Sequence, residues 1–255
     1  MRKLITLASF VALVMASCSN EEPNDSTNAK GRVFFDLALQ TEVEDTRSQI
    51  NCTTPAVEAF KLTIEGVDHT YKKEYDTIEK FNDGENYLHV GTYRATVTAG
   101  DLSQEGYDKA TFVGSKEFSV SARENTEVNI TAYIANTLVK VETTEAFKKY
   151  FVGGSKFELT TKAGNKFDVT GKTEPLFIAP EAFVVNGTAV KQATQSGAEG
   201  ATVELQYKME SPEAQTFYTI KFDLTEAGGA NIEITLNDTV VDTQLIDQEL
   251  NDNAK

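Results

Sequence analysis

Apolar and polar residues alternate with a period of two over most of the chain beyond residue 31. In residues 32–40, for instance, Val33, Phe35 and Leu37 share one face of an extended segment. Successive side chains of a β-strand point to opposite sides, so this period is typical of a strand with one buried face. The pattern recurs in many short segments, at residues 57–67, 86–100, 114–122, 126–142, 155–161, 165–171, 216–227 and 230–238.

Turn residues separate these segments. Residues 162–165 join two of the strands at hairpin distance, and Gly228-Gly229 separates another two. One helical turn is predicted over residues 143–151, where Thr144 can cap the helix and three aromatic side chains share a face. Many short strands without a regular alternation of strand and helix indicate an all-β fold made of antiparallel β-sandwiches.

The length of the chain fits two such sandwiches in tandem. One sandwich uses about 100 residues, and a change from strand to strand near residue 136 offers a boundary. We therefore expect an N-terminal sandwich over residues 32–135 and a C-terminal sandwich over residues 136–255.

The amino terminus has the features of an export signal. Arg2 and Lys3 precede an apolar run over residues 4–16, which is shorter than the roughly 20 residues that a membrane-spanning helix needs. Met15-Ala16-Ser17-Cys18 resembles the bacterial lipobox, in which the cysteine receives a lipid and becomes the new first residue. Residues 1–17 are thus predicted to be a lipoprotein signal peptide and Cys18 to be lipidated; an ordinary secreted protein is the alternative.

Residues 18–31 contain no apolar run and are predicted to be a flexible, acidic tether. Their Glu21-Glu22 pair resembles the acidic patch that sends some Bacteroides-type lipoproteins to the outer face of the outer membrane. The expected location is therefore the outer membrane, with a lipid anchor and the protein on the extracellular side. A solvated linker explains the same residues.

Composition excludes several function classes. Loss of Arg2 and Lys3 with the signal peptide moves the formal net charge from −15 to −17, and such an acidic chain repels nucleic acid. Because Cys18 is predicted to be lipidated, Cys52 has no disulfide partner, and we expect it to have a structural role. His69 and His89 share no metal-ligand spacing, so neither a metal nor a cofactor is expected.

No catalytic motif is present, and we expect no enzyme activity. Asp101, Glu105 and Asp108 offer the oxygen ligands that calcium takes. Their spacing matches no known calcium loop, so a solvated turn is the favoured interpretation.

Residues 91–142, which include "IANTLVKV" at 134–141, and "EITLND" at 233–238 resemble a Bacteroidales lipoprotein family of unknown function. That family is grouped by architecture with the fimbrillins, the pilus subunits of Bacteroidales, which have two transthyretin-like β-sandwich domains. The resemblance implies a surface protein with a structural or adhesive role, as a pilus tip, anchor or subunit. It brings no catalytic residues with it.

Such pili assemble by strand exchange, in which a strand of one subunit completes a sheet of its neighbour. Two segments could serve here, residues 31–47 and residues 239–250. A cut after Arg47, which resembles the processing site of fimbrillins, would release the first segment. The other interpretation of both is that they are ordinary edge strands of their own domains.

A second hypothesis is a stand-alone surface lipoprotein that binds a host or bacterial glycan or protein and does not polymerise. Loop residues 100–113 are the preferred ligand site for this case, with Tyr107 and Phe112 as the contact residues.

Overall fold

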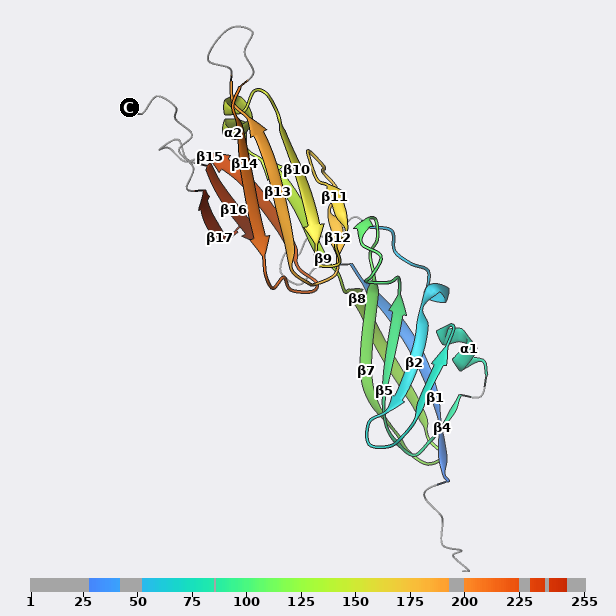
Figure 1. The fold of residues 1–255 in the computed structure, drawn as a ribbon. Helices are drawn as coiled ribbons and strands as arrows, with labels where there is room; N and C mark the ends of the chain where they lie inside the picture. Colours follow the sequence, from blue (N-terminus) through green and yellow to red (C-terminus); the bar gives the residue numbers. More distant parts are fainter. Residues whose placement is uncertain are drawn as a thin grey trace, which may run out of the picture.

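Two β-sandwiches, one after the other along the chain, make up a computed structural model of the protein (Figure 1). It describes residues 28–41, 52–84, 86–192, 200–224, 230–236 and 239–246, the last two segments without their side chains. Almost every element is a strand, which confirms the predicted all-β fold.

The first sandwich is one seven-stranded sheet folded over a single core. Its strand order is β3-β2-β5-β7-β8-β1-β4. β7 and β8 pair only through Phe112 opposite Ile134 and Val113 opposite Tyr133, so the sheet turns a corner there. The elements are β1 (Lys30–Gln40), η1 (Val57–Ala59), β2 (Lys61–Gly66), β3 (Lys72–Tyr75), α1 (Ile78–Asn82), β4 (Tyr87–His89), β5 (Gly91–Ala99), β7 (Phe112–Val120) and β8 (Asn125–Ile134).

The second sandwich packs a four-stranded sheet against a six-stranded one. Their orders are β11-β10-β13-β14 and β17-β16-β15-β9-β12-β6. The elements are β6 (Gly106–Tyr107), β9 (Thr137–Thr143), α2 (Glu145–Tyr150), β10 (Ser155–Thr161), β11 (Lys166–Asp168), β12 (Leu176–Ile178), β13 (Phe183–Val190), β14 (Thr202–Met209), β15 (Phe217–Leu224), β16 (Ala230–Leu236) and β17 (Thr239–Ile246).

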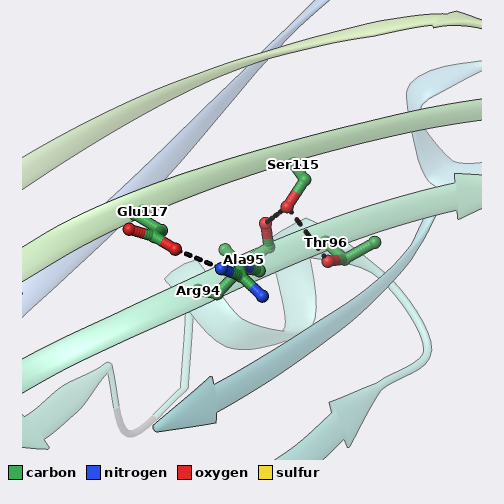
Figure 2. A network of polar contacts seen from close by, with 5 residues as sticks. All are labelled: Arg94, Ala95, Thr96, Ser115 and Glu117. Atoms are coloured by element: carbon green, nitrogen blue, oxygen red, sulfur yellow. Dashed lines mark hydrogen bonds and ion pairs between the residues drawn. The ribbon is translucent and has the colours of Figure 1, made fainter. Parts of the chain in front are cut away.

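The period-two pattern sorts side chains between core and solvent as predicted. In β5 the buried side chains are Tyr93, Ala95, Val97 and Ala99. The outward residues between them pair with β7: Arg94 donates to Glu117, and the hydroxyls of Thr96 and Ser115 lie 3.3 Å apart. Figure 2 shows this polar outer face, where Ser115 also donates to the backbone carbonyl of Ala95.

The helical turn predicted over residues 143–151 is confirmed as α2. Thr144 is its N-cap, and its hydroxyl accepts a hydrogen bond of 3.1 Å from the Phe147 amide, as an N-cap threonine should. Phe147 then points into the second core, where its ring lies 6.3 Å from that of Phe157.

The chain passes from one core to the other within β9. Leu138 belongs to the first core and Val139 to the second. We infer that the two sandwiches divide here; the domain limits of 32–135 and 136–255 stay a prediction.

The two sandwiches share one topology, although the sequence contains no obvious internal repeat. The order β3-β2-β5-β7, then β8-β1-β4, matches β11-β10-β13-β14, then β15-β9-β12, strand for strand along the chain. In both, the first strand of this repeated set lies beside the last strand of the set and runs parallel to it, as β1 with β8 and β9 with β15. The prediction of antiparallel sandwiches therefore holds for the other ladders but is wrong for these two pairs.

Gly187 in β13 lies opposite Phe157 in β10. A Cβ at position 187 would lie 2.5 Å from Cε1 of the Phe157 ring, so Gly187→Ala must displace the ring or the strand. We expect it to lower the free energy of unfolding by about 1–3 kcal/mol, the usual cost of overpacking, as measured by urea denaturation.

Thr188→Val is the matched control, because this neighbouring side chain is partly exposed and points the other way. It should change the free energy by no more than about 0.5 kcal/mol. An equal loss in both variants would contradict the close contact.

Candidate functional site

The loop between β5 and β7, which contains the predicted ligand site, crosses to the second sandwich. Its short strand β6 pairs antiparallel with β12, Tyr107 opposite Leu176 and Gly106 opposite Phe177. β6 thereby becomes the edge strand of the six-stranded sheet. We call residues 100–111 the junction loop, because they lie where the two sandwiches meet (Figure 1).

Glu105 is the centre of the polar contacts that the junction loop makes. Its half-buried carboxylate accepts a hydrogen bond from the Thr161 hydroxyl (2.7 Å), the Asn165 side-chain amide (2.8 Å) and the Ala179 backbone amide (3.0 Å). All three donors belong to the second sandwich, two of them near the β10–β11 turn. One side chain of the first sandwich thus fixes two separate segments of the second.

Tyr107 adds a second contact next to Glu105. Its hydroxyl donates to the Asp168 backbone carbonyl at 3.0 Å, and Nζ of Lys172 lies 5.7 Å from its ring centre. Burial raises the pKa of the Tyr107 phenol, and the negative charges of Asp168 and Glu174 raise it further. The phenol therefore stays protonated and keeps its role as a donor.

Asn136 closes the junction from the inside. This residue, fully buried between β8 and β9, accepts the Thr111 amide on its side-chain oxygen at 2.6 Å. Its backbone carbonyl accepts the Gln215 amide at 2.9 Å, while Ala135 donates to the Thr111 carbonyl at 2.7 Å. The link between the sandwiches is consequently bound to the junction loop on one side and to the start of β15 on the other.

Asp108 holds the segment that leads to η1 and β2 of the first sandwich. Its carboxylate accepts the amide and the hydroxyl of Thr53, at 3.2 and 3.1 Å. Burial, and then the charge of Asp108, raise the pKa of the neighbouring Cys52 thiol. A thiolate is disfavoured there, which suits the structural role expected of Cys52.

The structure places the two predicted contact residues in different surroundings. Tyr107 is half-buried in the contacts described above. Phe112 is fully buried in the first core, with its ring centre 6.5 Å from that of Phe60. The ligand role of this loop stays a prediction, and Phe112 would have to leave the core to take part in it.

The three loop carboxylates do not converge on one point. Asp101 accepts the amide and the hydroxyl of Ser103, whereas Glu105 faces the second sandwich and Asp108 faces Thr53. Over the described part of the chain, no three His, Cys, Asp or Glu side chains are grouped to hold a metal ion. The interpretation of this loop as a solvated turn stays a prediction.

Two further predicted sites, Cys18 and Arg47, lie outside the described residues, and their assignments stay predictions. None of the described helices combines the length and apolar character needed to cross a bilayer.

Sequence reasoning found the junction loop but missed its partners. Thr161, Asn165 and Asp168 lie more than fifty residues further along the chain, and nothing in their local pattern differs from an ordinary hairpin. Charge-assisted and neutral hydrogen bonds of the junction loop hold the two sandwiches together.

Glu105→Ala should loosen the junction. It removes the acceptor of three hydrogen bonds, so we expect the free energy of unfolding to fall by about 1–3 kcal/mol. Residual dipolar couplings should also show greater motion between the sandwiches. Glu127→Ala, at an exposed position of β8, is the control, and equal effects of the two changes would refute the role of Glu105.

Cys52 should react slowly with iodoacetamide. Because its pKa is raised, less thiolate is present at any given pH, and the alkylation rate should rise only at higher pH than for a cysteine in a short peptide. Asp108→Asn should move the profile back to lower pH. Peptide mass spectrometry separates Cys52 from Cys18, and an unchanged profile in the variant would exclude the influence of Asp108.

Comparison with known proteins gives one family match. The model of a domain of unknown function, DUF4493, matches residues 29–252. No curated protein matches the chain.

Several solved structures are similar to this one at low sequence identity. A DUF1812 protein from Bacteroides thetaiotaomicron has 12% identity and a TM-score of 0.42, and the match covers 88% of this chain and 100% of that one. A fimbrial assembly protein from Parabacteroides distasonis has 9% identity and a TM-score of 0.42, over 85% and 98% of the two chains. A candidate cell adhesion protein from Bacteroides eggerthii has 8% identity and a TM-score of 0.40, over 81% and 94%.

The resemblance to a family of unknown function that residues 91–142 indicated is confirmed by the family match, which spans both sandwiches. The chain belongs to the DUF4493 family.

Proposed function

We propose that this protein is a cell-surface protein with a structural or adhesive role, a fimbrillin-like pilus component that acts as tip, anchor or subunit. The observation that carries the proposal is the position of β1. β1 is not an edge strand: it lies between β8, with which it pairs from Arg32 to Gln40, and β4, with which it pairs from Lys30 to Arg32.

Loss of β1 would open a long groove in the first sandwich. Val33 and Phe35 of β1 are buried at 0% and 4% exposure, and each such side chain contributes about 1.5–3 kcal/mol by its burial. The backbone of β8 would lose a complete ladder at the same time. A chain cut after Arg47 and without β1 would therefore need another strand in its place.

The other end of the chain supplies a suitable strand. β17 is the last strand of the six-stranded sheet and pairs with β16 alone among the described strands. It includes Val241 and Leu245, which stand four residues apart in the sequence, and the proposed donor segment 239–250 extends beyond it. An incoming strand gains affinity from main-chain hydrogen bonds and specificity from alternate side chains.

The lipid anchor gives this proposal an orientation. β1 begins at one end of the molecule, and α2 lies at the other end (Figure 1). In an uncut chain, which keeps Cys18 and β1, a lipid on Cys18 and the tether of residues 18–31 would attach the first sandwich to the outer membrane. The second sandwich would then face away from the cell.

The alternative is a stand-alone surface lipoprotein that binds a glycan or protein. One observation favours it: with β1 in place, the first sandwich has a complete sheet, so an uncut chain offers no vacant position at β1.

Labelling of intact cells of the producing organism with tritiated palmitate, followed by gels and immunoblots of unboiled surface extracts, separates the two functions. An immunoblot ladder of this chain that collapses on boiling supports a strand-exchanged pilus, and its processed subunits carry no label because a cut after Arg47 removes Cys18. A single labelled band near monomer mass supports the stand-alone binder. Cys18→Ala should abolish the label. A label that persists in this variant would contradict the lipid anchor.

Arg47→Lys should abolish the ladder if processing releases β1, since an arginine-specific cut is lost while the charge is kept. Arg123→Lys is the matched control, because Arg123 lies in the exposed turn between β7 and β8. A ladder that survives Arg47→Lys would overturn the processing step.

A further inference from the structure

A cavity of about 470 Å³ opens on the second sandwich beside α2. β9 of one sheet and β10 of the other both line it, together with Lys148 of α2 and residues 170–173 after β11. Its size lies within the range of about 300–1,000 Å³ that is usual for small-molecule sites. No predicted site falls on it.

The charge of the cavity opposes that of the protein. The whole chain carries a formal charge of −15, yet three lysines, Lys140, Lys148 and Lys172, and a single carboxylate, Glu142, line the cavity. The remaining polar lining consists of hydroxyl side chains, among them Thr143 and Thr173.

One of the ion pairs of these lysines can give way to a ligand. Lys140 contacts Glu142 at 2.6 Å, and Lys148 contacts Glu145 at 2.9 Å. The Lys148–Glu145 pair is largely exposed, and exposed pairs contribute only about 0–1 kcal/mol. A ligand anion can replace such a carboxylate at little cost.

We propose that this cavity binds an anionic saccharide, a sugar carrying one carboxylate or sulfate group. The lysine ammonium groups would donate charge-assisted hydrogen bonds to the anion. The threonine hydroxyls and Glu142 would pair with the sugar hydroxyls, which both donate and accept hydrogen bonds.

The charge of the surface outside the cavity narrows the class of possible ligands further. An extended polyanion would meet the acidic remainder of the surface and be repelled. An isolated anionic group within a mostly neutral glycan meets only the lysines. The ligand class is thus a sparsely charged glycan rather than a sulfated polymer or a nucleic acid.

The position of the cavity suits adhesion. It adjoins α2, at the end of the molecule opposite the start of β1 (Figure 1). The inference rests on the adhesive part of the proposed function, but it needs neither processing at Arg47 nor assembly of a pilus.

Isothermal titration of the full chain tests this site. The probes are a disaccharide of glucuronic acid and N-acetylglucosamine, its sulfated analogue, a neutral disaccharide of the same size and sodium sulfate. We expect one or both acidic disaccharides to bind at least about tenfold more tightly than the neutral one, the effect of one hydrogen bond to a charged group.

Lys140→Gln should weaken that binding about tenfold for the same reason. Lys208→Gln is the matched control: Lys208 also pairs with a glutamate two residues along its strand, Glu210 at 2.7 Å, but lies outside the cavity. Lys172→Gln is a second variant in case Lys140→Gln lowers the melting temperature, and it should weaken binding as well.

Three results would overturn the site: no binding of either acidic disaccharide, equal binding of the neutral one, or an equal loss in Lys208→Gln. Sulfate that binds as tightly as the disaccharides would overturn the saccharide assignment and leave a simple anion site. None of these results would alter the ladder of unboiled surface extracts, so failure here and failure of the pilus proposal can be told apart.

Discussion

The fold of this protein depends on the parallel pairing of the first and last strands of the strand set that both sandwiches repeat, β1 with β8 and β9 with β15. Parallel neighbours cannot be joined by a tight turn and need a long crossover connection. Here the strands that lie between them in the chain, from β2 to β7 except β6 and from β10 to β14, form that connection. The first strand is therefore locked between neighbours, and the core closes only when both ends of the unit have met.

This closure has a kinetic cost and a functional use. Contacts between distant parts of the chain require loop-closure entropy to be lost before they stabilise anything, so such folds form slowly. If the first strand pairs late in folding, or is removed, the remaining strands are left with one vacant strand position. In this molecule the vacancy would lie between β8 and β4 and would be lined by the partners of Val33 and Phe35.

Local pattern in the sequence predicts what each strand buries, but not what it pairs with. Alternation placed Val33 and Phe35 in the core correctly, and Thr144 was identified as a helix cap from its neighbours alone. The pairing of β6 with β12 and the burial of Phe112 escaped prediction, because both depend on segments far along the chain. The Gly, Asp and Tyr residues of the junction loop indicated a ligand site. Only the tertiary contacts of Glu105 show that the loop joins the two sandwiches.

The separation of these contacts would let the proposed assembly and the proposed ligand binding coexist in one chain. The junction loop is held by β5 and β7 on one side and by β10, β11 and β12 on the other, and the polar contacts of Glu105 and Tyr107 do not include β1. The lysine cavity is likewise built from β9, α2, β10 and residues 170–173, and its lining includes neither β1 nor β17. Replacement of β1 by a strand of a neighbouring subunit would change the first core and leave the junction and the cavity with all of these contacts. A subunit could therefore accept a strand at β1 and donate residues 239–250 while the cavity keeps its lining.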